Sequence, residues 1–411
     1  MENAHKQLAW DSLTCLVVDD DKFSRTFIKT ALYQIGMKNT REAASAAEAV
    51  ELLNSFKIDI ILLDQQMPGK TGLEPDAKNI LKNLAHIEKQ QSRDCRIVCG
   101  YEAGCLGYSL YHQLHAHGID CVVLAPTTMM TKPGKRIKTD RRDARLISKC
   151  LAFHTYSPVY IPTEVDDAVK EYIRMRDDAN SALTRVKQQI IAFCIRHGKI
   201  HDGKSYWTNK HLEWLSSLDL GNKILSEVLQ EYLIRYYQLR EQVDMYDMRI
   251  NELAQAEPYR QKVEKLGCFR GIAAHTALSF CVEVGDFRRF ATAQQFASYL
   301  GLVPGECSSG DKQQYTGITK AGNSHLRKLL VETAQVFGRS ATKSGKSVAL
   351  KERQAKCDSL TVAYADKANA RLKKKYFKIA MRSKVNIAKT AVAREMACFI
   401  WGMMTDNISC A

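Results

Sequence analysis

Several aspartates in this sequence follow short apolar runs, where metal-dependent chemistry on phosphate esters could take place. Asp19 and Asp20 follow residues 13–18, and Asp64 follows residues 58–63. Short apolar runs bounded by polar residues predict buried strands. The carboxyl ends of parallel strands meet at one edge of a sheet, and Mg2+ prefers the oxygen ligands that carboxylates provide there. The alternative is that these are solvated aspartates at strand ends.

A second acidic group lies farther along the chain. Glu102 ends a strand-like run at residues 95–101, and Asp140 and Asp143 lie three positions apart near the start of a predicted helix. Residues three apart share one side of a helix, so both aspartates can face one point. Carboxylates brought together repel each other unless a divalent cation neutralises them, as in two-metal phosphodiester chemistry. The predicted Mg2+ ligands are Glu102, Asp140, Asp143, Asp19 and Asp20.

A serine beside a glycine forms the third group. Ser308, Ser309 and Gly310 lie in a predicted loop, and Lys320 and Arg327 follow. A serine next to glycine can expose its hydroxyl, and nearby cations favour attack of its alkoxide on a phosphate. Taken alone, Ser-Gly is also an ordinary turn, and the two cations could lie on a solvated helix face.

The elements that must position these residues change along the chain. Residues 13–74 alternate strand and helix patterns in the order βαβαβ, which predicts a parallel sheet, and residues 95–101 and 121–124 add two strands. Residues 165–265 keep a long helical periodicity. This predicts two long helices in a coiled-coil-like hairpin, with the turn at residues 198–207. A mostly helical region and a basic helical tail follow.

Length and composition limit the class of protein. The chain has 411 residues, of which 45% are hydrophobic and 26% charged, so it is globular rather than disordered. No run of about 18 apolar residues occurs, and the N-terminus lacks the apolar core of a signal peptide. The 13 cysteines contain no Cys-x-x-Cys pair and are typical of a reducing cytosol. We therefore expect a cytoplasmic protein with no membrane partner.

Positive charge is concentrated in the C-terminal part of the chain. The formal net charge is +15, yet residues 1–74 contain 8 Lys or Arg against 11 Asp or Glu. Residues 320–400 contain 19 basic and 5 acidic residues, which indicates a polyanionic partner and salt-dependent binding. Basic and aromatic residues alternate at residues 371–378, a pattern that suits backbone contact with stacking on bases. The candidate nucleic-acid ligands are Lys320, Arg327, Arg371, Lys373, Lys374 and Lys375.

Residues 16–21 and 59–74 resemble the receiver domain of bacterial response regulators. The resemblance implies that Asp19 and Asp20 correspond to Mg2+ ligands and Asp64 to the phospho-accepting aspartate. The later Thr or Ser and the Lys of that family do not occur at the expected strand ends, which are residues 101–102 and 125–126. The receiver sequence is therefore truncated, and we expect no lasting phosphorylation of Asp64.

Most of the remaining chain resembles the IS110 family of insertion-sequence transposases, which are DEDD recombinases with a RuvC-like, RNase H-like domain and a serine domain. The resemblance rests on residues 101–104, 125–126, 132–144, 269–272, 285–290, 299–304, 308–310 and 317–327. It implies DNA strand exchange at element ends through a serine–DNA intermediate, with Ser309 as nucleophile and Ser308 as the adjacent alternative. It also implies catalytic roles for Glu102, Asp140 and Asp143, a Mg2+ cofactor, a structured guide RNA and assembly of several copies around DNA.

The junction of the two resemblances departs from the transposase pattern, because the strand with that family's first catalytic aspartate is missing. In one interpretation the chain is a catalytically dead, nucleic-acid-binding remnant. In another, a right-handed crossover places the strand at residues 58–63 beside that at residues 95–101, so that Asp64 lies next to Glu102 and replaces the missing aspartate. A third alternative is a phosphorelay response regulator with a DNA-binding output.

The expected fold is an α/β N-terminal parallel-sheet region, a chimera of receiver and RNase H-like sequence, followed by a long helical hairpin and a mostly helical C-terminal domain. The expected domains are a truncated receiver at 13–74, a partial RuvC-like domain at 75–160, the hairpin at 161–265 and the serine domain with its basic tail at 266–400.

Overall fold

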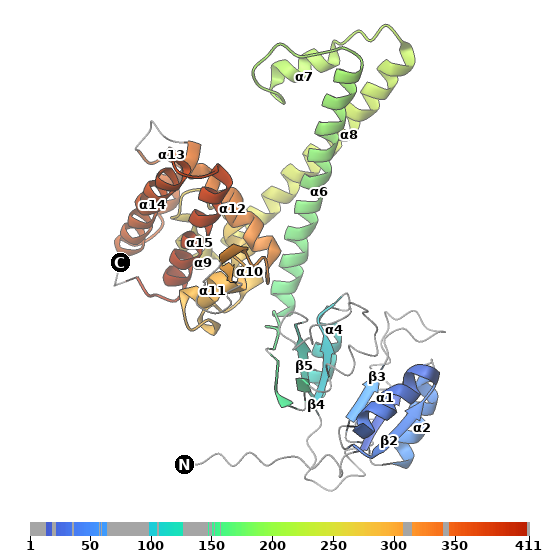
Figure 1. The fold of residues 1–411 in the computed structure, drawn as a ribbon. Coiled ribbons are helices and arrows are strands. Elements are labelled where there is room, and N and C mark those ends of the chain that lie inside the picture. Colours follow the sequence, from blue (N-terminus) through green and yellow to red (C-terminus); the bar gives the residue numbers. More distant parts are fainter. Residues whose placement is uncertain are drawn as a thin grey trace. The chain divides into compact units, whose positions relative to one another are not determined.

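The computed structural model describes most of the chain, and its gaps fall mainly in the N-terminal third. The described residues are 14–18, 22–34, 37–56, 58, 60–63, 98–104, 107–125, 147, 150–151, 153–156, 158–306, 315–339 and 345–408. The chain divides into two compact units, Met1–Ile161 and Pro162–Ala411, and each is described by itself (Figure 1).

The first sheet of the N-terminal unit has three parallel strands in the order β2-β1-β3. Its elements are β1 (Thr14–Val18), α1 (Lys22–Gln34), β2 (Asn39–Ala43), α2 (Ala46–Ser55) and β3 (Ile60–Leu63). Successive β1 side chains enter different small cores, because side chains alternate between the two faces of a strand. Val17 packs with Ile28 and Leu32 of α1, whereas Leu16 packs with Ala49 of α2. Burial on both faces explains why residues 15–18 of this strand are all apolar.

A second sheet follows, in which β4 (Val98–Glu102) pairs in parallel with β5 (Asp120–Leu124), and α4 (Ser109–Ala116) connects them. We expected β3 to be the parallel neighbour of β4 in one five-stranded sheet. That expectation is wrong for the described strands, because β3 pairs with β1 and β4 pairs with β5. Apolar side chains join the two sheets instead, since Leu114 and Ile119 share a core with Leu16 and Val18.

The C-terminal unit begins with the two long helices that the periodicity predicts. They are α6 (Glu164–Arg196) and α8 (Lys223–Gln255), which lie side by side in Figure 1 with α7 (Asn209–Ser216) at the far end of the hairpin. Thr163 and Asn222 cap α6 and α8 by accepting a backbone N–H with their side chains. Ile190 of α6 and Tyr236 of α8 are fully or almost fully buried in the core of the hairpin.

The remaining elements form a compact helical domain around one large core. They are α9 (Arg260–Gly267), α10 (Ala274–Val284), the 3-10 turn η3 (Phe287–Arg289), α11 (Ala293–Tyr299), β6 (Pro304–Glu306), β7 (Tyr315–Ile318), α12 (Ser324–Arg339), α13 (Val348–Gln354), α14 (Ser359–Ala380) and α15 (Val385–Met404). Phe269, Phe280, Phe296 and Phe337 are inaccessible to solvent in this core. Among the residues that the structure describes, no helix is long and apolar enough to span a membrane.

Candidate active site and nucleic-acid interface

Glu102 is the last residue of β4 and lies opposite the last residue of β5. Asp140 and Asp143 follow β5 in the sequence and lie outside the described residues. The strand end is held in place by Tyr101, whose buried hydroxyl donates a hydrogen bond to the Gly107 carbonyl at 2.9 Å. Burial raises the pKa of Tyr101 to about 12, so the phenol remains a neutral donor at physiological pH.

Helical residues that follow Asp143 cover the face of β4 to which Glu102 belongs. Gly100 and Glu102 are two positions apart and therefore share one face of the strand. A Cβ atom on Gly100 would lie 2.9 Å from both terminal methyl groups of Leu151, so a larger residue there would displace the Leu151 side chain. Leu151 and Cys150 also pack with Leu124 at the end of β5. Leu151, eight residues after Asp143, therefore packs on the strand face to which Glu102 belongs.

The second part of the site is the β6–β7 hairpin. β6 and β7 are antiparallel, with Pro304 aligned to Ile318, and the Thr319 N–H extends the pairing by donating to the Val303 carbonyl at 2.9 Å. Ser308 and Ser309 fall between the two strands, in a segment outside the described residues. The structure therefore describes the base of the hairpin and leaves the serine prediction untested.

Arg327 anchors the turn after β7, which gives it a structural contact that the sequence did not predict. Its guanidinium Nη1 donates to the carbonyls of Leu300 at 3.0 Å and Ala321 at 2.9 Å. Two glycines make the contact possible. A Cβ on Gly301 would lie 2.2 Å from the Ala321 carbonyl oxygen, and one on Gly322 would lie 2.0 Å from the Tyr299 carbonyl oxygen. Both glycines have positive φ.

A cluster of charged side chains joins α6, α10 and α12 beneath this turn. Asp177 of α6 accepts a hydrogen bond from His325 Nε2 at 2.8 Å. His275 Nε2 lies 3.0 Å from the other Asp177 oxygen, and Arg176 donates to Asp177 at 3.2 Å. Arg176 also makes a two-pronged contact with Asp247 of α8, at 2.7 and 2.9 Å. The Asp177 and His325 side chains are each 19% exposed, so solvent screens their contact only partly.

Glu283 of α10 supplies the second carboxylate of the cluster, and its side chain is 5% exposed. It accepts hydrogen bonds from Arg174 at 3.0 Å and from Asn323 Nδ2 at 2.8 Å, while His325 Nδ1 lies 3.5 Å away. Asn323 is also the N-cap of α12, because its Oδ1 accepts the Leu326 N–H at 3.0 Å. One side chain therefore ties the helix start to a buried carboxylate.

The two carboxylates keep His325 positively charged at neutral pH. Burial by itself lowers the pKa of His325, but the hydrogen bonds and negative charges of Asp177 and Glu283 outweigh it and raise the pKa to about 9. Burial likewise opposes ionisation of Glu283, yet His325, Arg174 and Asn323 lower its pKa to about 2. The pKa of Asp177 is lowered in the same way by His275, His325 and Arg176, against the effect of burial. Asp177, Glu283 and His325 are therefore all charged at neutral pH.

The basic tail differs in detail from the sequence-based prediction. Arg371 pairs with Glu395, and Lys375 lies 2.6 Å from the same carboxylate, so two of the predicted phosphate ligands have a protein partner. We also expected the tail aromatics to stack on bases. That expectation is wrong for Tyr376, which is 6% exposed in the main core, and Phe377 is partly buried against that core.

Several predicted residues cannot be placed. Those outside the described part of the chain are Asp19, Asp20, Asp64, Asp140, Asp143, Ser308 and Ser309. Among the described residues, no group of three or more His, Cys, Asp or Glu side chains could hold a metal ion. Asp177 and Glu283 were missed. Only Glu283 had a signal, since it is two residues before the Gly285 motif that indicated the serine domain.

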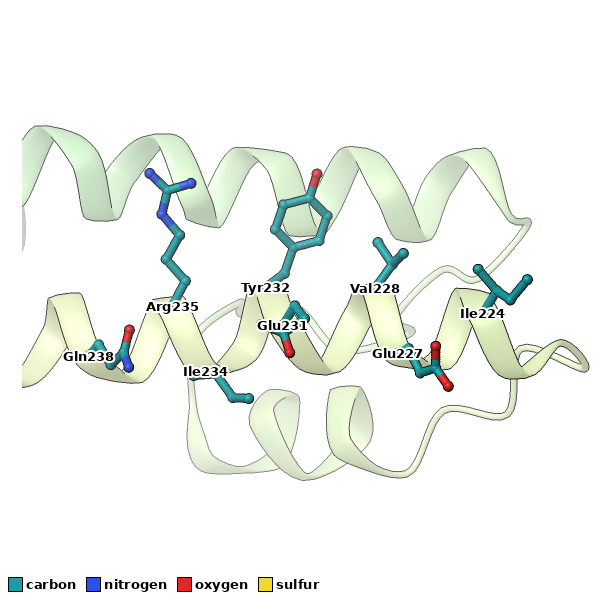
Figure 2. A pocket seen from close by; sticks show the side chains of 8 residues that line it. All are labelled: Ile224, Glu227, Val228, Glu231, Tyr232, Ile234, Arg235 and Gln238. Atoms are coloured by element: carbon teal, nitrogen blue, oxygen red, sulfur yellow. The ribbon is translucent and has the colours of Figure 1, made fainter.

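The helical hairpin of α6 and α8 has a shallow pocket whose lining residues all belong to α8. These residues are far in sequence from Glu102 and from the β6–β7 hairpin. Figure 2 shows the side chains that line it, which are Ile224, Glu227, Val228, Glu231, Tyr232, Ile234, Arg235 and Gln238. Two carboxylates beside one guanidinium on a single exposed helix face offer no nucleophile and no anion-binding geometry. This pocket is therefore not the candidate active site.

Two family models match this chain over the regions that contain the two parts of the candidate site. Residues 55–195 match the DEDD transposase model, described as "Transposase", and residues 264–351 match the model described as "Transposase IS116/IS110/IS902 family". The first match begins inside the segment that we assigned to the receiver and includes β3, Asp64 and Glu102. The second includes Glu283, both candidate serines and His325.

Two relatives cover most of this chain. It is 36% identical over 307 residues to the putative transposase y4qE of Sinorhizobium fredii, which is 74% of this chain and 75% of that protein. It is 33% identical over 321 residues to the transposase for insertion sequence element IS1533 of Leptospira borgpetersenii, which is 74% of this chain and 91% of that protein. A shorter match, 39% identical over 64 residues, is to the transcriptional regulatory protein YvrH of Bacillus subtilis and covers 16% of this chain and 27% of that protein.

Proposed function

Because this chain belongs to the IS116/IS110/IS902 transposase family and is a DNA transposase or recombinase by that resemblance, we propose that it exchanges DNA strands at the ends of an insertion sequence. Ser309 is the proposed nucleophile, and an acidic site around Glu102 is the proposed Mg2+ site. The observation that carries this proposal is the packing of Leu151 on Gly100. This contact supports the proposal, because Leu151 follows Asp143 by eight residues and packs on the strand face to which Glu102 belongs.

The residues of the acidic site are suited to a divalent cation. Glu102 lies at the carboxyl end of a parallel strand pair, and the approach of Asp140 and Asp143 would add two further hard oxygen ligands. In the proposal, Glu102, Asp140 and Asp143 hold the ion. When bound, Mg2+ would stabilise negative charge on the reacting phosphate.

The serine step conserves bonds and needs no oxidant or reductant. The Ser309 Oγ attacks the phosphorus of a DNA phosphodiester, so that an Oγ–P bond forms while the bond from phosphorus to the leaving sugar oxygen breaks. The serine loses its proton, and the leaving oxygen gains one. Arg327 supports this step from a distance, because it anchors the turn after β7 and thereby the base of the hairpin.

Partners other than DNA are also part of the proposal. A structured RNA from the element would guide the exchange, and several copies of the chain would assemble around DNA. Exposed apolar side chains on α8 support association of copies, since Ile234, Tyr237, Met245 and Met248 are each 46–66% exposed. Light scattering at increasing concentration tests this part, because a chain that remains a monomer contradicts it.

The decisive experiment is a Mg2+-dependent strand-exchange assay with the cognate element ends and RNA. Ser309→Ala is expected to abolish exchange and the covalent protein–DNA product, whereas Ser308→Ala retains both. Loss of both in Ser308→Ala alone would move the nucleophile by one residue. Glu102→Gln is expected to abolish exchange at every Mg2+ concentration. Full exchange by Glu102→Gln would refute the acidic site.

The second candidate function is a catalytically dead, nucleic-acid-binding remnant. The remnant alternative is favoured by the described sheets, in which β3 does not pair with β4. Direct pairing would have placed the end of β3, which precedes Asp64, beside the end of β4, which is Glu102. A wild-type chain that binds element DNA but never exchanges strands supports this alternative.

The receiver-like sequence makes a separate prediction about phosphorylation. Incubation with a small phosphodonor is expected to leave no lasting adduct on Asp64, and an adduct detected by mass spectrometry would contradict that.

A further inference from the structure

We propose that one exposed side of α14 binds the phosphate backbone of a nucleic acid through four cations on successive helical turns. These residues, the α14 stripe, are Lys367, Arg371, Lys374 and Lys378. This role rests on the proposed function, which supplies the polyanion. The sequence suggested that consecutive basic residues of the tail bind nucleic acid. The structure indicates instead a set of residues that share one side of the helix.

The stripe follows from the helical repeat. With 3.6 residues per turn, positions 367, 371, 374 and 378 fall within an arc of about 60° on the helix. At 1.5 Å per residue they span about 16 Å along its axis. All four side chains are exposed, whereas Leu372 and Tyr376 on another side of α14 are buried in the main core. In Figure 1, α14 lies on the outer side of the C-terminal domain, so this helix is accessible.

The three consecutive lysines point in different directions, because neighbouring residues are about 100° apart on a helix. Lys374 belongs to the stripe. Lys375 is turned toward α15, where it lies 2.6 Å from Glu395, and Lys373 is partly buried. In the structure, therefore, only Lys374 of the three is fully on the exposed side of the helix. Nothing in the sequence distinguishes it from its two neighbours.

Little negative charge opposes the stripe. Within the described part of the chain, Lys367, Lys374 and Lys378 form no ion pair, and Arg371 is 71% exposed despite its contact with Glu395. Asp366, the acidic residue of α14 itself, is held by Lys346 at 2.5 Å and Gln354 at 3.0 Å. The stripe thus presents positive charge to solvent.

The spacing suits a nucleic-acid backbone. One strand of duplex DNA has a phosphate about every 3.4 Å along the axis, so 16 Å corresponds to about five phosphates. Flexible lysine stems can adjust to phosphates that do not coincide with helix turns. Contacts of this kind fix orientation without reading sequence, so the surface should bind duplex DNA and structured RNA by the same chemistry.

Two double variants of the full-length chain test the stripe. Lys374→Gln/Lys378→Gln removes two stripe cations, and Lys373→Gln/Lys375→Gln removes two cations of the same helix outside the stripe. Binding to a labelled 20-base-pair duplex and to an RNA hairpin is measured from 50 to 300 mM salt. Each lost phosphate contact lowers the slope of log Kobs against log salt by about 0.9 on duplex DNA and about 0.7 on single strands. The stripe variant should therefore lose about 2 units on duplex DNA.

The outcomes separate the surface from the function. An unchanged slope in the stripe variant, or an equal change in both variants, overturns the stripe even if strand exchange is intact. A slope that falls with the duplex alone, or with the RNA alone, supports the stripe and identifies its polyanion. A wild-type chain that binds neither nucleic acid at low salt overturns the stripe and the proposed function together.

Discussion

The hydrogen bond from His325 Nε2 to Asp177 Oδ2, 2.8 Å long, joins the first turn of α12 to the middle of the long helix α6. A cation in the first turn of a helix is opposed by the helix dipole, so this position requires the carboxylates of Asp177 and Glu283. The same contact connects the helical hairpin to the turn that follows β7. The base of the serine-bearing hairpin is therefore held by buried charges as well as by apolar packing.

The His325 contact predicts a specific loss of stability at high pH. Because the folded pKa is raised to about 9 from an ordinary 6.5, its stabilisation is fully present below pH 6.5 and is lost as pH rises through 9. The full effect is on the order of 1–3 kcal/mol. The thermal unfolding temperature of the C-terminal unit should decrease as the pH is raised from 7 to 10. The decrease should be smaller in His325→Gln. An identical pH profile in the variant would contradict the prediction.

Asn323 should contribute more than an ordinary helix cap, because its side chain also bonds Glu283. Asn222, which caps α8 with its side-chain oxygen, provides a matched control. Replacement of either by alanine should cost about 1 kcal/mol for the cap, and Asn323→Ala should cost more. Substitution by aspartate distinguishes the two cap positions further. Asn222→Asp should be neutral, whereas Asn323→Asp places two carboxylates together and should destabilise at pH 7 in denaturant titrations. Equal effects at both sites would refute the special role.

Arg327 is expected to act by anchoring a turn rather than by binding phosphate. Arg327→Ala should lower strand exchange at least tenfold, which corresponds to about 1.4 kcal/mol. The salt dependence of DNA binding should remain unchanged, because both donors of its Nη1 are directed at backbone carbonyls. Lys328→Ala, at an exposed neighbouring position, controls for the lost charge. A slope reduced by about 0.9 in Arg327→Ala alone would show a phosphate contact instead.

Gly100 should be required for the acidic site. An alanine there meets the Leu151 methyl groups at 2.9 Å and should push the segment after Asp143 away from Glu102. Gly100→Ala is expected to raise the Mg2+ concentration needed for half-maximal exchange. The double variant Gly100→Ala/Leu151→Ala removes the clash and should recover part of the activity. No difference between the single and double variants would mean that this contact does not position the site.

The sequence by itself determined the elements whose patterns are local. The apolar run of β1, the strand that ends in Glu102 and the two long helices each follow from the spacing of apolar residues, because a strand or helix buries whatever its own repeat places on one face. The family also followed from short motifs whose chemistry depends on residue type. The roles of Ser309, Asp140 and Asp143 still rest on that resemblance.

The tertiary structure decided which elements meet. Strand order could not be read from the chain, since it depends on which elements pack together, and in the described sheets β3 pairs with β1 and β4 pairs with β5. The cluster of Asp177, Glu283 and His325 combines residues separated by as many as 148 positions. Three adjacent lysines are equivalent in the sequence, but helix rotation sends Lys374 outward and Lys375 toward Glu395. The charge of a side chain follows from the residue type alone, whereas its ion-pair partner depends on how the helices pack.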